Sequence, residues 1–225
     1  MARFRRMEVL ETMIGTGLVP IFYHRDPEVG MKVAGACAEG GSRLLEFTHR
    51  GDRAHLVFAE LIQRCEAEHH ELIVGAGSIG DPHTAALYLA SGANFIVAPN
   101  FNPEVARICN RRKVPYVPGC GSATEIAAAE EMGAEIVKLF PADALGGPKF
   151  VRAIRGPCPW TSLMPTGGIE MEEDNIRDWI DSGVACLGMG AKLIAKELLA
   201  RGDYPEITRR VRQILDWVRA ARGGD

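Results

Sequence analysis

The feature of this sequence that most constrains its fold is a regular alternation between short apolar runs and longer amphipathic stretches. The short runs are typical of strands buried on both faces, and the longer stretches repeat their apolar residues at helical spacing. The predicted strands lie at residues 18–23, 43–50, 72–78, 95–99, 115–120, 136–141, 162–167 and 185–190. The predicted helices lie at residues 3–15, 27–39, 53–67, 82–91, 103–112, 122–132, 148–154, 172–182, 192–199 and 205–221. This order predicts an α/β fold with a parallel sheet.

Eight strand–helix units close naturally into a (β/α)8 TIM barrel, and we expect residues 1–225 to form one such domain. The first helix would precede the barrel as an N-terminal helix, and residues 205–221 would form an extra C-terminal helix. A doubly wound open sheet is the alternative, but no GxGxxG motif follows the first predicted strand. No linker or low-complexity tract indicates a second domain.

Composition argues against several classes of function. The formal net charge of -3 is unfavourable for a nucleic-acid partner. No apolar run approaches the length of a membrane span, and the N-terminus lacks the apolar core of a signal peptide. The 6 cysteines include no CxxC pair and no metal-ligand spacing with histidine, which predicts reduced thiols and no metal. We therefore expect a soluble, cytoplasmic protein.

A lysine inside an apolar run is the strongest chemical signal. Lys138 is the third residue of IVKLFP (136–141), where it shares a strand face with Ile136 and Phe140. Burial disfavours the charged form of an amine, so a buried lysine tends to be neutral and nucleophilic. A neutral amine that faces a pocket can form a Schiff base with a carbonyl substrate. The alternative is a lysine at a strand end whose ammonium group reaches water.

Side-chain alternation gathers polar residues on one face of several strands. Glu46, Thr48 and Arg50 share a parity in LLEFTHR (44–50), whereas the apolar residues between them take the opposite parity. Ser78 ends the third predicted strand and Thr166 ends the seventh. Because active sites of parallel barrels lie at the C-terminal ends of the strands, we expect these side chains to converge there with Lys138.

The residue types indicate a reaction. Lys138 would form an iminium with a ketone, and this iminium is an electron sink for cleavage of an adjacent carbon–carbon bond. Glu46 would carry the proton that moves during cleavage; alternatively, it is only an ion-pair partner that keeps Lys138 charged. Arg50 offers two parallel hydrogen bonds to a carboxylate, or else forms a salt bridge with Asp52 at the rim. Ser78 and Thr166 are hydroxyl donors, or else turn residues.

Glycines mark a candidate phosphate site. Gly167 and Gly168 follow the seventh predicted strand, and Gly188 and Gly190 lie at the end of the eighth. Glycines allow backbone N–H groups to approach an anion, and barrels commonly bind phosphate at this end, although glycines also serve tight turns. Phe140 would form an apolar wall beside Lys138; simple core packing is equally compatible with it.

Five motifs now carry a resemblance to a known family. The sequence looks like the 2-keto-3-deoxy-6-phosphogluconate (KDPG) / 4-hydroxy-2-oxoglutarate (KHG) aldolases over essentially its whole length. The motifs are LLEFTHR (44–50), VGAGS (74–78), PGCGSATE (118–125), KLFPAD (138–143) and PTGGI (165–169). The resemblance implies a class I aldolase on a (β/α)8 barrel, a homotrimer that acts on a small-molecule 2-keto acid without a metal or other cofactor.

The resemblance also implies roles for individual residues. Lys138 would be the Schiff-base lysine and Glu46 the general acid/base. The residues that hold the pyruvate-derived half would be Arg50, Ser78 and Thr166, beside Phe140. The residues around the phosphate would be Gly167, Gly168 and Gly188. The implied reaction is the cleavage of KDPG to pyruvate and glyceraldehyde 3-phosphate, with the cleavage of 4-hydroxy-2-oxoglutarate to pyruvate and glyoxylate as a second candidate.

Several positions depart from the family pattern. Ser78 stands where many members have threonine, and Arg50 is followed by Gly51-Asp52. Ala191 occupies a position where relatives often place a phosphate-binding serine, and residues 22–25 of the first strand also differ. The alternatives are an aldolase for 2-keto-3-deoxy-6-phosphogalactonate or another pyruvate-dependent aldolase, a phosphate-binding barrel isomerase in which Lys138 acts only electrostatically, and a non-catalytic trimeric scaffold.

Overall fold

The computed structural model describes residues 2–223, in which strands and helices alternate as predicted. The strands are β1 (Leu18–Phe22), β2 (Leu44–Thr48), β3 (Ile73–Gly77), β4 (Ile96–Val97), β5 (Tyr116–Val117), β6 (Gly119–Cys120), β7 (Val137–Leu139), β8 (Leu163–Pro165) and β9 (Leu187–Met189). The helices are α1 (Arg6–Thr16), α2 (Pro27–Glu39), α3 (Ala54–Glu68), α4 (Pro82–Ala90), α5 (Pro103–Arg112), α6 (Ala123–Glu131), α7 (Pro148–Arg155), α8 (Glu173–Asp181), α9 (Lys196–Arg201) and α10 (Tyr204–Ala221).

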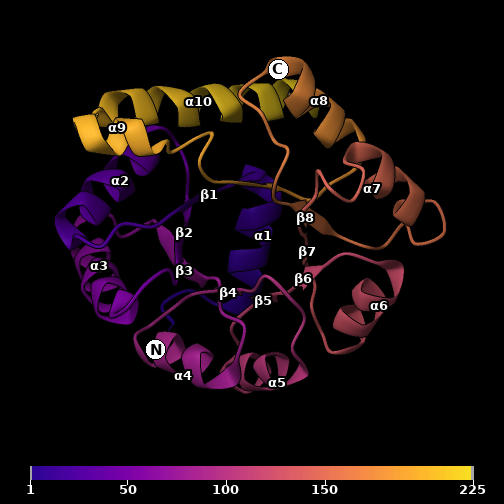
Figure 1. Cartoon of the computed structure of the whole chain (residues 1–225), viewed down its shortest axis with the longest axis horizontal. Coiled ribbons are helices and arrows are strands. Elements are labelled where there is room, and N and C mark those ends of the chain that lie inside the picture. The colour runs from indigo at the N-terminus through magenta and orange to yellow at the C-terminus, as the bar shows by residue number, and fades with distance from the viewer. Residues whose placement is uncertain (1, 224–225) are drawn as a thin grey trace.

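The strands form a curled parallel arrangement, and the helices surround it (Figure 1). A six-stranded sheet has the order β5-β4-β3-β2-β1-β9, and a three-stranded sheet has the order β6-β7-β8. Each pairing between these strands is parallel. The protein therefore has the α/β fold that the alternation predicts, with helices outside a curled sheet.

The predicted strand at 115–120 is interrupted, and this interruption divides the strands into two sheets. β5 and β6 flank Pro118, which has no N–H group to contribute to a ladder. At the other junction, an isolated bridge joins Thr166 to Gly188. Beside that bridge, the Ala185 N–H donates to the Leu163 carbonyl over 2.8 Å. The two sheets thus follow one another along the chain at β5 and β6, and hydrogen bonds link them between the β8 and β9 segments.

Strand side chains divide between two apolar clusters, and the division follows the predicted parity. The outer cluster lies between the strands and the helices and contains Leu45, Phe47 and Leu139. The inner cluster contains Leu44 and Ile136, which have the opposite parity. Side chains that share the inner parity and lie further along the strands, toward their C-terminal ends, face the inside of the curled sheet.

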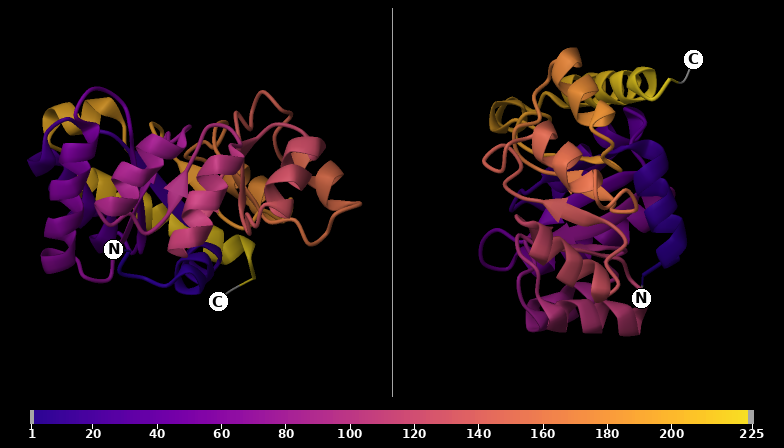
Figure 2. Two further views of the ribbon diagram at one scale, coloured as in Figure 1. Left: turned by 90° about the horizontal axis from the view of Figure 1, so that it is seen from below. Right: turned by 90° about the vertical axis from the view of Figure 1, so that its right-hand side faces the viewer.

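Helix α1 closes the N-terminal end of the strands. It supplies Val9, Leu10 and Met13 to the inner cluster, and Figures 1 and 2 place it across one end of the ring. After α10, the Arg222 guanidinium donates to the carbonyls at the end of α1, over 2.7 Å to Ile14. The extra C-terminal helix α10 lies outside, against α2 and α8 (Figure 1). Within residues 2–223, no helix combines the length and apolar character that a membrane span needs.

Cap residues explain why several predicted helix starts are accurate, whereas α1, which has no side-chain cap, begins at Arg6 and not at residue 3. Four helices begin after a side chain that accepts a backbone N–H of the first turn, with proline next or second in the helix. These cap residues are Asp26, Asp81, Asn102 and Asp203. Helix α9 differs from the prediction of 192–199, because it begins at Lys196 after a turn in which the Gly190 carbonyl accepts the N–H groups of Leu193 and Ile194.

Candidate active site

A cavity of about 510 Å³ opens at the C-terminal ends of the strands. It is lined by residues that end or directly follow β2, β3, β7, β8 and β9. Each side chain or glycine that the sequence predicted for the site lines this one cavity: Glu46, Arg50, Ser78, Lys138, Phe140, Thr166, Gly167, Gly168 and Gly188. The residues selected by strand parity thus lie in the same cavity as the glycines selected as a phosphate site. Their chemical roles remain predictions.

Lys138 is the middle residue of β7 and is only 7% exposed. Its strand partners are Gly119 in β6 and Met164 in β8, so the side chain projects between two neighbours into the cavity. Burial lowers the pKa of its ammonium, and the Arg50 cation lowers it further, whereas Glu46 opposes the shift. The Nζ atom lies 4.9 Å from the centroid of the Phe140 ring. The environment thus favours the nucleophilic, neutral amine.

Glu46 lies in β2 and is completely buried. Both of its carboxylate oxygens lack a hydrogen-bond partner among the described residues. Burial raises the pKa of this carboxyl group, against the opposing effects of Lys138 and Arg50. The missing hydrogen bonds argue against the alternative in which Glu46 only holds Lys138 charged, since the two groups share a cavity without being bonded. A small molecule between them could exchange a proton with Glu46.

A glycine makes room for this carboxylate. A Cβ atom on Gly77 in β3 would overlap a carboxylate oxygen of Glu46. Gly77 belongs to the VGAGS motif (74–78), but this role was not predicted, because a glycine in a strand usually indicates a bulge or a close backbone approach rather than space for a distant side chain. The residue two positions earlier has the same function for the inner core: a Cβ atom on Gly75 would overlap the ring of Phe95.

Arg50 and Ser78 lie at one side of the cavity, in the loops after β2 and β3. The Arg50 guanidinium has neither an ion-pair nor a hydrogen-bond partner in the part of the chain that the structure describes, so the alternative rim pair with Asp52 is not formed. The Ser78 backbone has a φ of 62°, which a non-glycine residue rarely adopts. Thr48, which shares the parity of Arg50, also lines the cavity and donates its hydroxyl to the Phe22 carbonyl over 3.3 Å.

Thr166 lies where the two sheets meet. Its hydroxyl oxygen is buried and has no hydrogen-bond partner among the described residues. A Cβ atom on Gly188, its bridge partner in β9, would overlap that hydroxyl oxygen. The absence of a side chain at Gly188 therefore allows the hydroxyl group to lie at the cavity, where it is available to a ligand.

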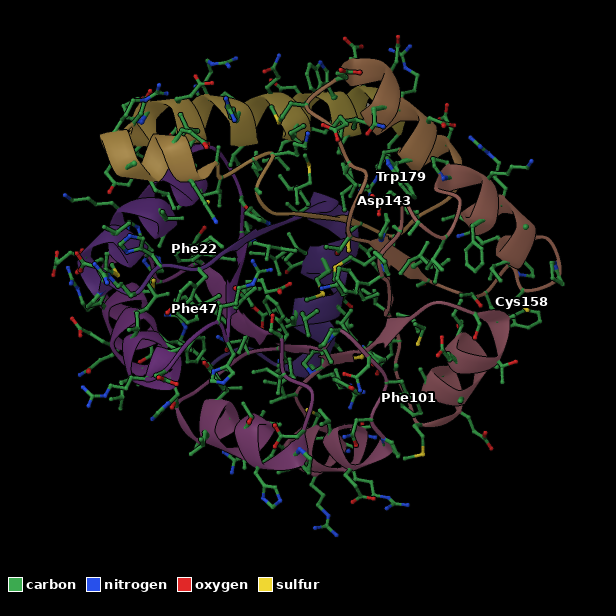
Figure 3. The ribbon with its side chains drawn as sticks, in the orientation of Figure 1. Phe22, Phe47, Phe101, Asp143, Cys158 and Trp179 are labelled. Atoms are coloured by element: carbon green, nitrogen blue, oxygen red, sulfur yellow. The ribbon has the colours of Figure 1, made fainter. Side chains whose placement is uncertain are left out.

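The glycines after β8 line the cavity, and the N–H groups of Gly167 and Gly168 have no hydrogen-bond partner among the described residues. Gly167 and Gly168 have φ values of 102° and 70°, and a Cβ atom on Gly168 would lie 2.6 Å from that of Asp143. The Gly168 carbonyl accepts the indole N–H of Trp179 over 3.2 Å, on the helix side, where Figure 3 shows Trp179 close to Asp143. A trans peptide directs the next N–H, that of Ile169, the opposite way. Such N–H groups suit an anion.

Several cavity residues lie outside the predicted set. Tyr23 follows β1 and packs its ring 5.7 Å from that of Phe47, beside the Phe22–Phe47 contact that can be followed in Figure 3. Glu170, Lys192 and Lys196 line the far end. These last three residues lie in or directly after loops, where no periodicity indicates which way a side chain points. For Tyr23, the available signal in the sequence was that residues 22–25 depart from the family pattern.

Metal ligation has no candidate here. Among residues 2–223, no three histidine, cysteine, aspartate or glutamate side chains group in a way that could hold a metal ion. All six cysteines have free thiols. The chemistry that the arrangement itself supports is nucleophilic and acid–base: a desolvated amine, a carboxyl group of raised pKa, a guanidinium and hydroxyl groups in one cavity.

A desolvated lysine at the C-terminal ends of parallel strands, with a proton carrier beside it, is the arrangement of a Schiff-base lyase. Comparison with known proteins agrees. The family model described as KDPG and KHG aldolase matches residues 9–210, and the chain therefore belongs to the KDPG/KHG aldolase family. Aldolases are lyases, and the protein is accordingly an enzyme of this class.

Individual relatives support the same assignment. The chain is 31% identical over 218 residues to the 2-dehydro-3-deoxy-phosphogluconate aldolase of Haemophilus influenzae, covering 96% of this chain and 99% of the relative. It is 37% identical over 187 residues to the enzyme of that name from Pseudomonas aeruginosa, covering 83% and 82%. The KDPG aldolase of Legionella pneumophila, solved with pyruvate captured as a covalent carbinolamine intermediate, superposes with a TM-score of 0.83 at 26% identity, covering 91% and 97%.

Proposed function

We propose that the protein is a class I aldolase that cleaves KDPG to pyruvate and glyceraldehyde 3-phosphate. The observation that carries this proposal is the pair Lys138 and Glu46, whose pKa values burial shifts in opposite directions while both groups face one cavity without a mutual hydrogen bond. 4-Hydroxy-2-oxoglutarate, which has the same reactive 2-keto-4-hydroxy acid unit, is a second substrate in this proposal. The galactonate, isomerase and scaffold alternatives are not favoured, because the curated relatives carry the names of KDPG aldolases.

The reaction follows from the two groups. The neutral Lys138 amine attacks the substrate ketone at C2, and loss of water leaves an iminium. Glu46 takes the proton of the C4 hydroxyl, the C3–C4 bond breaks, the aldehyde leaves, and the bond electrons form an enamine. Glu46 returns its proton to C3, and water then hydrolyses the iminium to pyruvate and the free amine. Burial raises the pKa of this carboxyl group, which makes it a better proton acceptor and thus suits it to carrying the proton.

The surrounding groups divide the substrate between two ends of the cavity. We assign the carboxylate of the pyruvate half to the Arg50 guanidinium, which has no protein partner, with the Ser78 and Thr166 hydroxyls near the carboxylate and C2 oxygen. Phe140 covers the apolar side of the iminium. The N–H groups around Gly167, Gly168 and Gly188 would receive the phosphate of the aldehyde half.

We further propose that the two sheets act as one closed (β/α)8 TIM barrel, and that residues 1–225 form a single domain. The support is the consecutive position of β5 and β6 and the bridge between Thr166 and Gly188, which together leave no break between neighbouring strands. Family membership supports a homotrimer in the cytoplasm. Light scattering on the purified protein should give three chain masses in solution, and a monomer would contradict the assembly.

The deciding test is the intact-protein mass after sodium borohydride with pyruvate. Reduction of an iminium fixes pyruvate to the wild-type protein, whereas Lys138→Ala should acquire no added mass, since it has no amine at that position. A wild-type protein that gains no pyruvyl mass would remove the covalent mechanism. Loss of KDPG cleavage in Lys138→Ala, measured as pyruvate release, should accompany the loss of the adduct.

A further inference from the structure

An ion pair joins two loops at the far end of the active-site cavity. The Lys192 ammonium, in the turn after β9, lies 2.8 Å from the Glu170 carboxylate, in the loop after β8. Both residues line the cavity, and their side chains are 62% and 40% exposed. Neither residue belongs to the site that the sequence predicts. Their position brings one negative and one positive charge to the place where the distal half of the substrate would lie.

The two loops also expose backbone N–H groups. No hydrogen-bond partner exists among the described residues for the N–H groups of Gly167 and Gly168, and the same holds for Ala191 and Lys192. In the second loop, the Gly190 carbonyl accepts the two following N–H groups of the turn, from Leu193 and Ile194. Free N–H groups on facing loops suit an anion, but Ala191 adds no hydroxyl group to them. Glu170 even brings a carboxylate, which repels an incoming phosphate.

We propose that Glu170 and Lys192 determine how strongly the enzyme prefers a phosphorylated substrate: Lys192 leaves Glu170 to bind the distal phosphate, and Glu170 competes with that phosphate for the cation. This inference rests on the proposed aldolase function. Lys192 in this way replaces the hydroxyl contact that Ala191 cannot make, and Glu170 limits the affinity that the cation adds.

The exchange is physically reasonable because both partners are exposed. An exposed ion pair contributes little to stability, so separating it costs little. A phosphate monoester carries about -1.5 to -2 charges at neutral pH and offers three acceptor oxygens, whereas a carboxylate carries a single charge. The flexible four-carbon stem of lysine allows its ammonium to move between the two acceptors. Lys196, which also lines the cavity, adds a second positive charge to the same end.

The test compares Lys192→Met and Glu170→Gln, with Lys149→Met, an exposed lysine of α7 outside the cavity, as the matched charge control. The measurement is the ratio of KM for KDPG to KM for its unphosphorylated counterpart. We expect this ratio to rise about tenfold in Lys192→Met and to fall about two- to fivefold in Glu170→Gln. Lys149→Met should keep the wild-type ratio.

The opposite signs are the signature of competition. If the ion pair only holds the two loops together, both variants raise the ratio, and the proposal is overturned; an unchanged ratio in Lys192→Met overturns it as well. Binding of inorganic phosphate, measured by calorimetry, gives a second readout without catalysis, with weaker binding in Lys192→Met and tighter binding in Glu170→Gln. A wild-type protein that traps no pyruvate would contradict the aldolase function, whereas the phosphate titration would still test the pair.

Discussion

Burial shifts the pKa values of Lys138 and Glu46 in opposite directions, because it disfavours the charged form of each group. The pKa of Lys138 is lowered and that of Glu46 is raised. Lowering the Lys138 pKa stabilises the fold at high pH, and this contribution is lost as pH falls through the folded-state value. Raising the Glu46 pKa stabilises the fold at low pH, and this contribution is lost as pH rises through the folded-state value. Each group therefore lowers stability in the pH range where its buried charged form must be accommodated.

Arg50 should add to the effect of burial on the pH at which Lys138 becomes reactive. In the wild type, the rate of pyruvate trapping should rise with pH around a midpoint below 10.5, the ordinary lysine value. Arg50→Met removes a cation that disfavours the ammonium form, so the midpoint should move to higher pH. The measurement is trapping rate against pH. Arg25→Met, on the neighbouring loop after β1, is the control and should leave the midpoint in place; an unshifted midpoint in Arg50→Met would contradict the role of Arg50.

Glu46→Gln should impair proton transfer while leaving Schiff-base formation at Lys138 intact. We expect kcat for KDPG to fall by about 10²–10⁴-fold, the usual contribution of a positioned acid or base. Borohydride should still trap pyruvate on Lys138, because the amine is unchanged. The melting temperature should not decrease, since neither carboxylate oxygen makes a hydrogen bond that the amide would lose. Full activity in this variant would assign the proton transfer to another group.

At the residue scale, the sequence predicted the cavity residues around Lys138 but did not predict Glu170 and Lys192. Lys138, Glu46 and Arg50 belong to strands or their immediate ends, where side chains alternate strictly, so parity predicts direction. Glu170 and Lys192 lie in loops, where direction depends on backbone turns that no spacing rule describes. The missing hydrogen bond to Glu46 was also beyond prediction, because it depends on distances across the sheet.

At the scale of the element, β3 contributes to the site through two glycines, which leave room for side chains from other parts of the chain. Three of its residues face inward, and two of them, Gly75 and Gly77, leave space for the Phe95 ring and for the Glu46 carboxylate. β2 and β3 are paired in register, with Glu46 opposite Gly75. The carboxylate therefore lies above the inner core because the neighbouring strand has no side chains at these two positions.

The two glycines of β3 should respond differently to the same substitution. Gly75→Ala forces a methyl group against an aromatic ring in the inner cluster and should cost about 1–3 kcal/mol of stability. Gly77→Ala meets the Glu46 side chain from Cγ to a carboxylate oxygen. It should displace this carboxyl group and lower kcat more than it lowers the melting temperature. Thermal unfolding and KDPG cleavage of the two variants provide the measurement. Equal losses of stability would contradict the distinction.

Helices were predicted more accurately than strands, and local chemistry explains the difference. A cap such as Asp81 followed by Pro82 fixes a helix start within the chain itself. Strand pairing depends on the neighbouring strand, and Pro118 breaks the ladder in a segment whose apolar character predicted one continuous strand. The start of α9 was also missed, because the turn at Gly190 carries no cap signal in the sequence.

At the scale of the whole molecule, the apolar side chains form two concentric layers, which stabilise the fold and leave the C-terminal ends of the strands for the candidate active site. The outer layer joins strands to helices, and the inner layer fills the N-terminal end of the ring beneath the site. The sequence predicted a helix before the first strand but not its position across the end of the ring, since its apolar spacing does not identify the surface that it covers. The last helix, whose role the sequence left open, packs outside against α2 and α8.

Met13→Ala should show that α1 supports the fold rather than the reaction. Met13 is fully buried in the inner cluster, so its truncation leaves a cavity and should cost about 2–5 kcal/mol. Below the lowered melting temperature, KDPG cleavage should remain near the wild-type rate. Chemical denaturation and a steady-state assay are the two measurements. A large fall in kcat with unchanged stability would mean that α1 also orders the site.

The position of α1 has a kinetic consequence. Because the inner cluster fills the N-terminal end of the ring, substrate and products enter and leave the cavity through the loops at the opposite end. In the proposed mechanism, the pyruvate half is bound covalently to Lys138 inside the cavity, whereas the aldehyde half lies nearer the loops. The aldehyde must therefore depart first and pyruvate last. Accumulated pyruvate would then compete directly with fresh substrate, while the aldehyde would not, so the flow of carbon through this enzyme is sensitive chiefly to how quickly pyruvate is consumed.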